Sequence, residues 1–327
     1  MKKYMLGFDI GGTKCAVVLG ECDGNGGKCR IEDKIRFETD SKRGWRAVVE
    51  QLLSSAEEII SRNGRKAEEF IGCGISCGGP LDSKKGIILS PPNLPDWDHV
   101  ELVRMTQERL GIPTRLQNDA NACALAEWHF GAGQGSTNMV FLTFGTGMGA
   151  GLVLNGRLYS GTNDNAGEVG HIRLSEDGPL GYGKNGSFEG FCSGGGIARL
   201  AKQIVLSEQE KGIIPSFFDE TIGWDSVTAK SVAEAAKQGD ETAVKIYDVC
   251  GEYLGRGLSI LIDILNPDTI VIGSIFERSS ALLLKKMNEF IRREALDGAA
   301  GVCKIVPASL GDSIGDYAAL GVAMMTE

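Results

Sequence analysis

Apolar and polar residues recur along this chain with two periods, one typical of strands and the other of helices. Short apolar runs predict strands at 70–76, 114–117, 269–273 and 303–310, and two apolar–glycine–apolar stretches predict hairpins within 4–19 and 139–154. Apolar residues at helical spacing predict helices over 45–62, 100–110, 118–130, 193–207, 228–238, 241–265, 280–297 and 313–325. Because strands alternate with helices, the pattern predicts an α/β protein with mixed sheets.

The tip of the first hairpin is unusually polar for a turn. Residues 8–20 read FDIGGTKCAVVLG, with two glycines, a threonine and a lysine between two apolar runs. Glycine pairs leave backbone N–H groups exposed, and such groups can bind phosphate oxygens. Thr13 adds a hydroxyl donor, and Asp9 could hold a metal ion directly or through water. An ordinary surface turn would look similar, so on this stretch alone both interpretations stay open.

The second hairpin repeats the layout of the first. Residues 139–154 read MVFLTFGTGMGAGLVL, again a strand, a glycine turn and a strand. An ungapped overlay pairs three positions in each hairpin: Phe144 with Phe8, Gly147 with Gly11 and Val153 with Val17. Hairpins of one design near the start of each half suggest two related α/β domains facing each other, with chance likeness as the alternative.

The second glycine turn also matches a loose dinucleotide-binding pattern. Gly145, Gly147 and Ala150 fit G-x-G-x-x-G/A, but that pattern must open a helix, whereas residues 151–154 continue as a strand. The chain contains no Walker A sequence, G-x-x-x-x-G-K-[ST]. If the protein binds nucleotide phosphates, we therefore expect the two hairpins to hold them.

Length, charge and cysteine content narrow the classes of protein. The 327 residues suffice for one large domain or two ordinary ones, and 42% apolar and 24% charged residues are typical of a soluble globular protein. A net charge of −9 without a Lys/Arg run argues against a nucleic-acid partner. We expect no signal peptide and no membrane span. The nine cysteines, odd in number and without a C-x-x-C pair, favour a reduced, cytoplasmic protein over a disulfide scaffold.

Further stretches carry polar residues that could do chemistry. Asp119 follows a predicted strand at the start of a helix, where the helix dipole favours the ionised carboxylate. Such a group can accept the proton of a sugar hydroxyl during phosphoryl transfer, although capping the helix is the simpler role and the one that spacing alone favours. Other candidates would line a polar cleft able to bind several hydroxyls, or form a salt-bridged surface. These candidates are Asn93, Asn118, Glu168, His171 and Glu189.

Together these motifs resemble the ROK family of bacterial sugar kinases and related sugar-responsive repressors. The motifs are DIGGTK, PPNLPDW, QNDANACALAE, FGTGMGAGLVLNG, NAGEVGH and NPDTIVIGSI, and they run in the family's order from Phe8 to the closing helix. The resemblance implies an actin-like, hexokinase-like (ribonuclease H-like) ATPase fold with two α/β domains around a cleft. We expect a smaller N-terminal domain over 1–117, which the C-terminal helix 312–327 rejoins, and a larger domain over 118–311.

The resemblance also implies a role for each candidate residue. The implied cofactors are ATP and Mg²⁺, with Asp9 near the metal and Asp119 as the catalytic base. Phosphate contacts are implied for Asp9, Gly11, Gly12, Thr13, Lys14, Gly145, Thr146 and Gly147. The implied contacts near the adenine are Gly273 and Ser274. The implied sugar contacts are Gly79, Asn93, Asn118, Asp119, Glu168, His171 and Glu189.

One motif departs from the family. ROK proteins usually bind a structural zinc through the histidine of GH and three cysteines in C-x-C-G-x-x-G-C-x-E. Here the cysteine positions hold Leu180, Tyr182 and Ser187, and none of these is a usual zinc ligand. We therefore expect no structural zinc, packing of Tyr182 and Phe188 to hold the loop, and His171 to remain available to the sugar.

These inferences predict an ATP-dependent kinase that phosphorylates a hexose hydroxyl, with glucose as the default substrate and a homodimer as the expected assembly. A sugar-sensing repressor and a non-catalytic sugar or nucleotide binder of the same family are the alternatives. The repressors carry a helix-turn-helix module before the first hairpin, and seven residues precede Phe8 here, so we expect no such module. Intact Asp9, Asp119 and glycine turns argue against a decayed binder.

Overall fold

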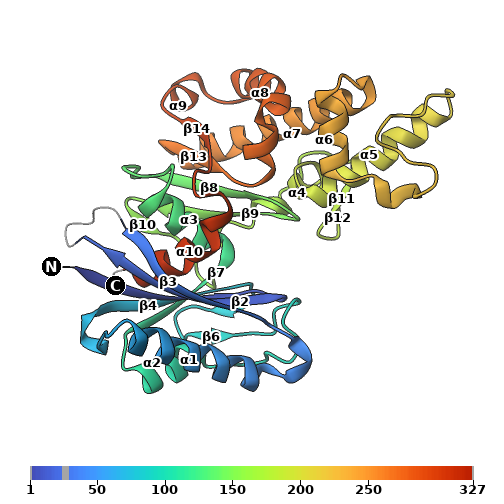
Figure 1. Ribbon diagram of the computed structural model, residues 1–327. Helices are drawn as coiled ribbons and strands as arrows, with labels where there is room; N and C mark the ends of the chain where they lie inside the picture. The colour runs from blue at the N-terminus through green and yellow to red at the C-terminus, as the bar shows by residue number, and fades with distance from the viewer. Residues whose placement is uncertain (1, 24–28, 326–327) are drawn as a thin grey trace. The chain divides into compact units, whose positions relative to one another are not determined.

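The computed structural model describes residues 2–23 and 29–325, and the chain divides into two compact units (Figure 1). Unit 1 contains the described residues of Met1–Gly135, Arg157–Ala166 and Ser309–Glu327. Unit 2 contains Ser136–Gly156 and Gly167–Ala308. The expected boundary after residue 117 lies too early, because α3 (Asp119–Phe130) packs against α10 (Ile314–Ala323) within unit 1.

Unit 1 is built on a five-stranded mixed sheet of order β3-β2-β1-β4-β7. Its strands are β1 Lys3–Ile10, β2 Lys14–Cys22, β3 Cys29–Glu38, β4 Phe70–Cys77 and β7 Thr114–Asn118. The first three strands form an antiparallel meander, whereas β1, β4 and β7 run parallel. Strand β3 was not predicted from the sequence.

Helices cover both faces of the unit 1 sheet, α1 and α2 on one side and α3 and α10 on the other (Figure 1). The core under α1 (Trp45–Arg62) and α2 (Leu102–Leu110) contains alternate residues of β1, such as Leu6 and Phe8. Met5 faces the other way and packs with Leu320 of α10. This alternation follows the two-residue period of a strand, so β1 is buried on both faces.

Unit 2 repeats this design with strands in the order β9-β8-β13-β14. These strands are β8 Met139–Phe144, β9 Met148–Leu154, β13 Thr269–Ile272 and β14 Lys304–Pro307. As in β2-β1-β4-β7 of unit 1, an antiparallel hairpin is followed by two parallel strands. The same order in two sheets supports the prediction of two related α/β units.

Comparing the two hairpins corrects the overlay made from the sequence. The last paired residues are Ile10 with Cys15 in the first hairpin and Phe144 with Met148 in the second. Phe144 therefore corresponds to Ile10 rather than to Phe8. The ungapped overlay is out of register by two residues, because glycine patterns alone do not show where strand pairing ends.

The helices of unit 2 follow their capping residues closely. The longest, α7 (Glu241–Leu265), has the predicted bounds: the side chain of Asp240 accepts a hydrogen bond from the Ala243 N–H at 2.9 Å, and Asn266 is left-handed at φ 44°. Helix α8 (Ile275–Glu294) begins five residues earlier than predicted, because Ser274 and Glu277 form a capping box. The remaining helices of this unit are α4 Phe188–Phe191, α5 Gly194–Gln209, α6 Ala229–Lys237 and α9 Asp297–Ala300.

Short elements connect these parts. The short strands are β5 Leu81–Asp82, β6 Ile87–Ile88, β10 Arg157–Leu158, β11 Leu180–Gly181 and β12 Lys184–Asn185. The 3₁₀ turns are η1 Ser41–Arg43, η2 Ala67–Glu69, η3 Val169–His171, η4 Gly223–Ser226 and η5 Gly311–Ser313. Among the described residues, every helix is too short or too polar to cross a membrane.

The cysteines only partly match the expectation of free thiols. Cys22 and Cys29 lie opposite each other on β2 and β3, 4.1 Å apart between Cα atoms, and form a disulfide. The prediction of reduced cysteines is wrong for this pair, because the pairing of β2 with β3 places two cysteines seven residues apart directly opposite each other. Burial raises the pKa of Cys15, Cys77 and Cys123, which stay protonated as small apolar groups.

Candidate active site

In unit 1 the candidate residues gather where parallel strands end. Ile10, Cys77 and Asn118 are neighbours across β1, β4 and β7, so the segments that follow these strands leave from one edge of the sheet. Ligand sites in α/β sheets lie at such carboxyl ends. The predicted residues at this edge are Asp9, Gly11, Gly12, Thr13, Lys14, Gly79, Asn118 and Asp119.

Asn93 lies against two of these segments, although it comes from a separate proline-rich loop. A Cβ added at Gly12 would come within 2.5 Å of the Asn93 carbonyl oxygen. A Cβ at Gly78 would lie 3.3 Å from the Asn93 side-chain oxygen. Glycine at position 12 is therefore required by close approach of Asn93 to the turn. Gly79 is exposed and has open space around its Cα.

Asp9 is the most perturbed acid of unit 1. Burial and then the charge of Asp316 raise its pKa from 3.8 to about 6. Asp316, in the first turn of α10, is paired with Lys34 at 2.6 Å. A Cβ added at Gly315 would lie 2.8 Å from Asp9 Oδ2, so only glycine leaves room for the Asp9 carboxylate against this helix. Sequence reasoning missed Gly315 and Asp316, because the closing helix carries no motif of its own.

Asp119 is the first residue of α3, but it does not cap the helix. Asn118 has that role, since its side-chain oxygen accepts a hydrogen bond from the Asn121 N–H at 2.8 Å. One Asp119 oxygen accepts from the Ala120 N–H at 2.8 Å, and the side chain remains exposed. Desolvation by the surrounding protein raises the pKa of Asp119 and outweighs these backbone bonds. The helix start was expected to favour the ionised form of Asp119. That expectation is wrong for the net effect, because the pKa of Asp119 lies above its ordinary value.

In unit 2 the second glycine turn is fixed by the segment that leads into α5. Gly194 N–H donates to the Gly145 carbonyl at 2.7 Å, and Gly195 N–H donates to the Thr146 carbonyl at 3.4 Å. Glu189 Oε2 accepts from the Met148 N–H at 3.1 Å and would lie 2.8 Å from a Cβ at Gly147. Glu189 thus orients the glycine turn, a role that sequence reasoning did not assign to it.

Glu168 and His171 lie near the same turn in unit 2. Both side chains are exposed. The backbone just before η3 is bonded to β9, since the Ala150 N–H donates to the Gly167 carbonyl at 2.7 Å. A Cβ at Gly170 would collide with the Met148 carbonyl and lie 3.2 Å from Glu189 Cβ. Gly170 therefore brings the segment that contains Glu168 and His171 against Glu189.

Gly273 and Ser274 follow β13 at the carboxyl edge of the unit 2 sheet. Ser274 has φ 56° and ψ −102°, a conformation that non-glycine residues rarely adopt. Its N–H donates to Glu277 Oε1 at 2.6 Å, and its hydroxyl accepts from Arg278 at 3.1 Å. A Cβ at Gly145 would lie 3.7 Å from the Ser274 hydroxyl, so Ser274 adjoins the glycine turn.

The loop that carries zinc in related proteins has a different support here. Ser187 is buried, and its hydroxyl donates to the Gly181 carbonyl at 3.2 Å and accepts from the Gly190 N–H at 3.1 Å. Phe188 is buried against Gly257 of α7, as predicted. Tyr182 is 79% exposed and touches only the edge of the His171 ring, so the prediction that it packs is wrong. Leucine, tyrosine and a hydrogen-bonded serine do not fit a zinc site, and the described residues contain no cluster of three metal-ligating side chains.

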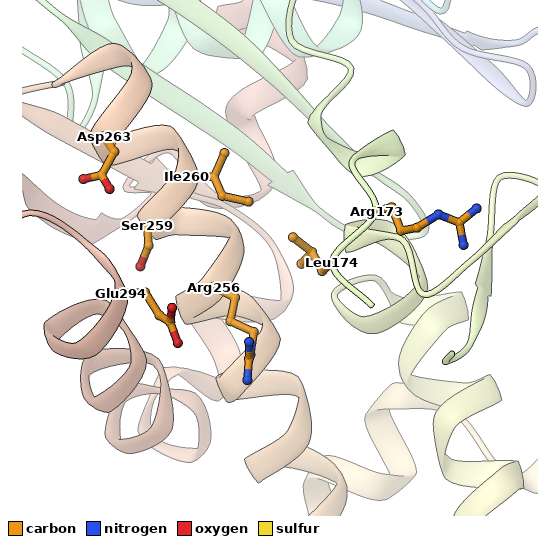
Figure 2. Close-up of a pocket in the computed structure, with 7 residues that line it drawn as sticks. All are labelled: Arg173, Leu174, Arg256, Ser259, Ile260, Asp263 and Glu294. Atoms are coloured by element: carbon orange, nitrogen blue, oxygen red, sulfur yellow. The ribbon is translucent and has the colours of Figure 1, made fainter. Parts of the chain in front are cut away.

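A shallow pocket of about 240 Å³ lies elsewhere in unit 2 (Figure 2). Its lining residues are Arg173, Leu174, Arg256, Ser259, Ile260, Asp263 and Glu294. Arg256 is already paired with Glu252 at 2.9 Å, and one Asp263 oxygen accepts from the Leu296 N–H at 3.0 Å. The pocket includes none of the predicted site residues, so the chemistry of the glycine turns identifies the candidate site better than this hollow does.

Comparison with known proteins identifies the family. The ROK family pattern matches residues 5–326. A glucokinase from Halalkalibacterium halodurans is 31% identical over 315 residues, which cover 96% of this chain and 92% of that protein. Xylose repressor from Caldicellulosiruptor bescii is 29% identical over 94% of this chain and 75% of its own length.

Solved structures give the same result. A ROK hexokinase from Thermus thermophilus has a TM-score of 0.76 and 29% identity, with 98% of each chain covered. A ROK glucokinase from Streptomyces griseus in complex with glucose and AMPPNP has a TM-score of 0.69 and 30% identity, covering 97% of this chain and 98% of that one. The fold is thus that of the actin-like ATPases. The chain belongs to the ROK family.

Proposed function

We propose that this chain is an ATP-dependent sugar kinase that transfers the γ-phosphoryl group of Mg-ATP to a hexose hydroxyl. The observation that carries the proposal is the placement of two acids, Asp9 and Asp119, beside the first glycine turn at the carboxyl edge of the unit 1 sheet, where the pKa of each is raised. Perturbed carboxylates at the carboxyl ends of parallel strands are typical of catalytic sites. Relatives named glucokinase make glucose the default hexose.

Asp119 is the proposed general base. Because Asn118 caps α3, the Asp119 carboxylate does not serve as the helix cap and remains exposed. A raised pKa brings a base closer to the operating pH, which makes proton transfer from a sugar hydroxyl more effective. Asp119 would take that proton as the hydroxyl oxygen attacks the γ-phosphorus and the bond to the β-phosphate oxygen breaks.

Asp9 is the proposed residue for Mg²⁺, directly or through water. Carboxylate oxygens suit this ion, which usually keeps several waters and binds one or two carboxylates together with substrate phosphates. Asp9 fits that use because burial, and then the neighbouring charge of Asp316, disfavours its ionisation, so a cation would stabilise the ionised form. When bound, the ion offsets charge on the phosphates.

The remaining assignments follow the family. Backbone N–H groups of the two glycine turns, together with Thr13 and Lys14, would bind phosphates, with Gly273 and Ser274 near the adenine. The proposed sugar contacts are Gly79, Asn93, Asn118, Glu168, His171 and Glu189. We also propose a cytoplasmic homodimer that takes sugar and ATP as its ligands and needs no zinc.

The test is ADP formation from Mg-ATP across a panel of hexoses and N-acetylhexosamines. The proposal expects ADP only when the right sugar is present, with one sugar phosphate formed per ADP. A chain that binds sugar without making ADP would instead be a sensor or a binder, which the similarity to the xylose repressor keeps as the second candidate.

A further inference from the structure

Glu127, near the end of α3, is a buried carboxylate satisfied by uncharged donors. Its side chain is 0% exposed. One oxygen accepts from the Ala132 N–H at 2.7 Å and the Ser309 hydroxyl at 3.3 Å. The other accepts from the N–H groups of Ser309 and Leu310, both at 3.0 Å. A buried charge is tolerated only when it is so fully hydrogen-bonded, and each such bond is stronger than a neutral one.

The donors come from two distant segments of unit 1. Ala132 lies just after α3, shortly before the chain leaves unit 1 at Gly135. Ser309 is the residue at which the chain re-enters unit 1, and Leu310 leads through η5 into α10. A single side chain therefore joins the end of α3 to the segment that starts α10.

The two helices joined in this way each carry part of the candidate site. Asp119 is the first residue of α3, and Gly315 in the first turn of α10 lies against the Asp9 carboxylate. The helices also touch along their length, since a Cβ at Gly321 would lie 3.0 Å from the Leu125 backbone. Helix α10 thus contacts both the Asp9 carboxylate and the helix that begins at Asp119, so its axial placement on α3 sets where Gly315 meets Asp9.

We propose that Glu127 is a positioning residue for phosphoryl transfer, holding α10 on α3 so that Gly315 keeps its place against the Asp9 carboxylate. The inference rests on the proposed kinase function. Glu127 lies eight residues beyond Asp119, about 12 Å along the helix axis, so it acts through these helices rather than on the substrate. Small displacements of reacting groups lower the rate strongly even when binding is little changed.

Two variants disturb this carboxylate in different ways. Glu127→Gln keeps the shape but replaces one acceptor oxygen by an NH₂ group, which would face a backbone N–H or a hydroxyl donor. Gly131→Ala leaves Glu127 intact and places a methyl group where it collides with Glu127 Oε2. Gly131 has φ −121° and ψ −144°, so its φ lies outside the left-handed region that disfavours alanine. If Glu127→Gln does not fold, Gly131→Ala still tests the proposal.

Glu208→Gln is the matched control. Glu208 is also a buried glutamate near the end of a helix, but it lies on α5 of unit 2 and pairs with Lys211 at 3.0 Å and Lys245 at 3.6 Å. Its neutralisation weakens two ion pairs on α5 without touching α3 or α10. Replacing a buried glutamate by glutamine in unit 2 should therefore leave kcat unchanged.

The experiment measures kcat and KM for sugar and ATP, together with backbone amide exchange over 309–316. We expect Glu127→Gln and Gly131→Ala to lower kcat about tenfold to a hundredfold, with both KM values within about twofold of wild type. Amides of Ser309, Leu310 and the first turn of α10 should exchange faster in both variants. Glu208→Gln should keep wild-type kcat.

The outcomes separate the two claims. Wild-type kcat in both variants, a rise in KM alone, or an equal fall of kcat in Glu208→Gln would overturn the positioning role of Glu127. If the wild-type protein makes no ADP with any sugar, the proposed function fails. Backbone amide exchange over 309–316 then decides whether Glu127 holds α10. In that case unchanged protection over 309–316 in the variants would overturn the claim that Glu127 holds α10.

Discussion

The carboxylate of Asp9 lies against Gly315, so that a methyl group at position 315 would come 2.8 Å from Asp9 Oδ2. Asp9 lies in the first motif of the chain, and Gly315 lies in its last helix. Their contact shows why a segment without a recognisable motif belongs to the site. The closing helix provides a surface that contacts the Asp9 carboxylate. Burial, and then the charge of Asp316 on this helix, raises the pKa of Asp9.

Gly315→Ala should reduce activity without reducing stability. Alanine is favoured over glycine within a helix by about 0.5–1 kcal/mol, but its Cβ would displace the Asp9 carboxylate. We expect kcat to fall about tenfold or more while the melting temperature holds or rises. Gly298→Ala in α9 is the control, because a Cβ there meets open space. Wild-type kcat in Gly315→Ala would show that Asp9 does not depend on this contact.

Asp9→Asn should change how stability depends on pH. The folded pKa of about 6 exceeds the ordinary value of 3.8, so ionisation of Asp9 opposes folding and wild-type stability falls as pH rises through this window. The effect is at most about 3 kcal/mol, at about 1.4 kcal/mol per pKa unit. Asparagine cannot ionise, so the variant should gain stability relative to wild type between pH 4 and pH 8. Urea unfolding of the ligand-free proteins measures this, and parallel pH curves would refute it.

Ser187→Ala should destabilise the loop that replaces the zinc site. The variant removes a buried hydroxyl that donates to Gly181 and caps α4 at Gly190, at a cost of about 1–2 kcal/mol. Chemical denaturation measures the loss. Ser54→Ala, on the exposed face of α1, should change stability by less than about 0.5 kcal/mol. Equal effects at both positions would mean that Ser187 does not support the loop.

Removal of metal ions should leave the folded protein intact. The residues at the three cysteine positions are poor zinc ligands, and Ser187 is already hydrogen-bonded. We therefore expect dialysis against a strong chelator to leave the melting temperature unchanged, with activity restored by Mg²⁺ alone. Zinc retained in stoichiometric amount, or unfolding on chelation, would contradict the account of this loop.

Local patterns predicted most elements, and the failures have physical reasons. The bounds of α7 were predicted correctly, and the structure explains them by the Asp240 cap and the left-handed Asn266, because capping acts within a few residues. Strand β3 was missed although Ile31, Ile35 and Phe37 alternate with charged residues, a pattern typical of a half-buried strand. The domain boundary was placed too early, because the contact of α3 with α10 joins positions far apart in sequence.

The site residues also divide into those that local motifs predicted and those whose role only the tertiary packing reveals. Motifs pointed to Asp9, Asp119 and the glycine turns, since turn chemistry and acids next to strands are visible locally. The link between Glu189 and the Met148 N–H, and the closeness of Gly315 to Asp9, depend on tertiary packing that no local pattern encodes. Tyr182 was expected to pack because it is aromatic. Its own backbone is in a left-handed turn conformation, at φ 46°, and its side chain is exposed.

The most direct test of the kinase proposal is sugar-dependent ADP formation by wild type and Asp119→Asn, with Asp297→Asn in the first turn of α9 as the control. A general base contributes about 10²–10⁴-fold to the rate. We predict that Asp119→Asn loses at least about a hundredfold in kcat, retains binding of sugar and ATP, and that Asp297→Asn matches wild type. Wild-type kcat in Asp119→Asn would contradict the assignment of the base, and no ADP from the wild type with any sugar would contradict the kinase itself.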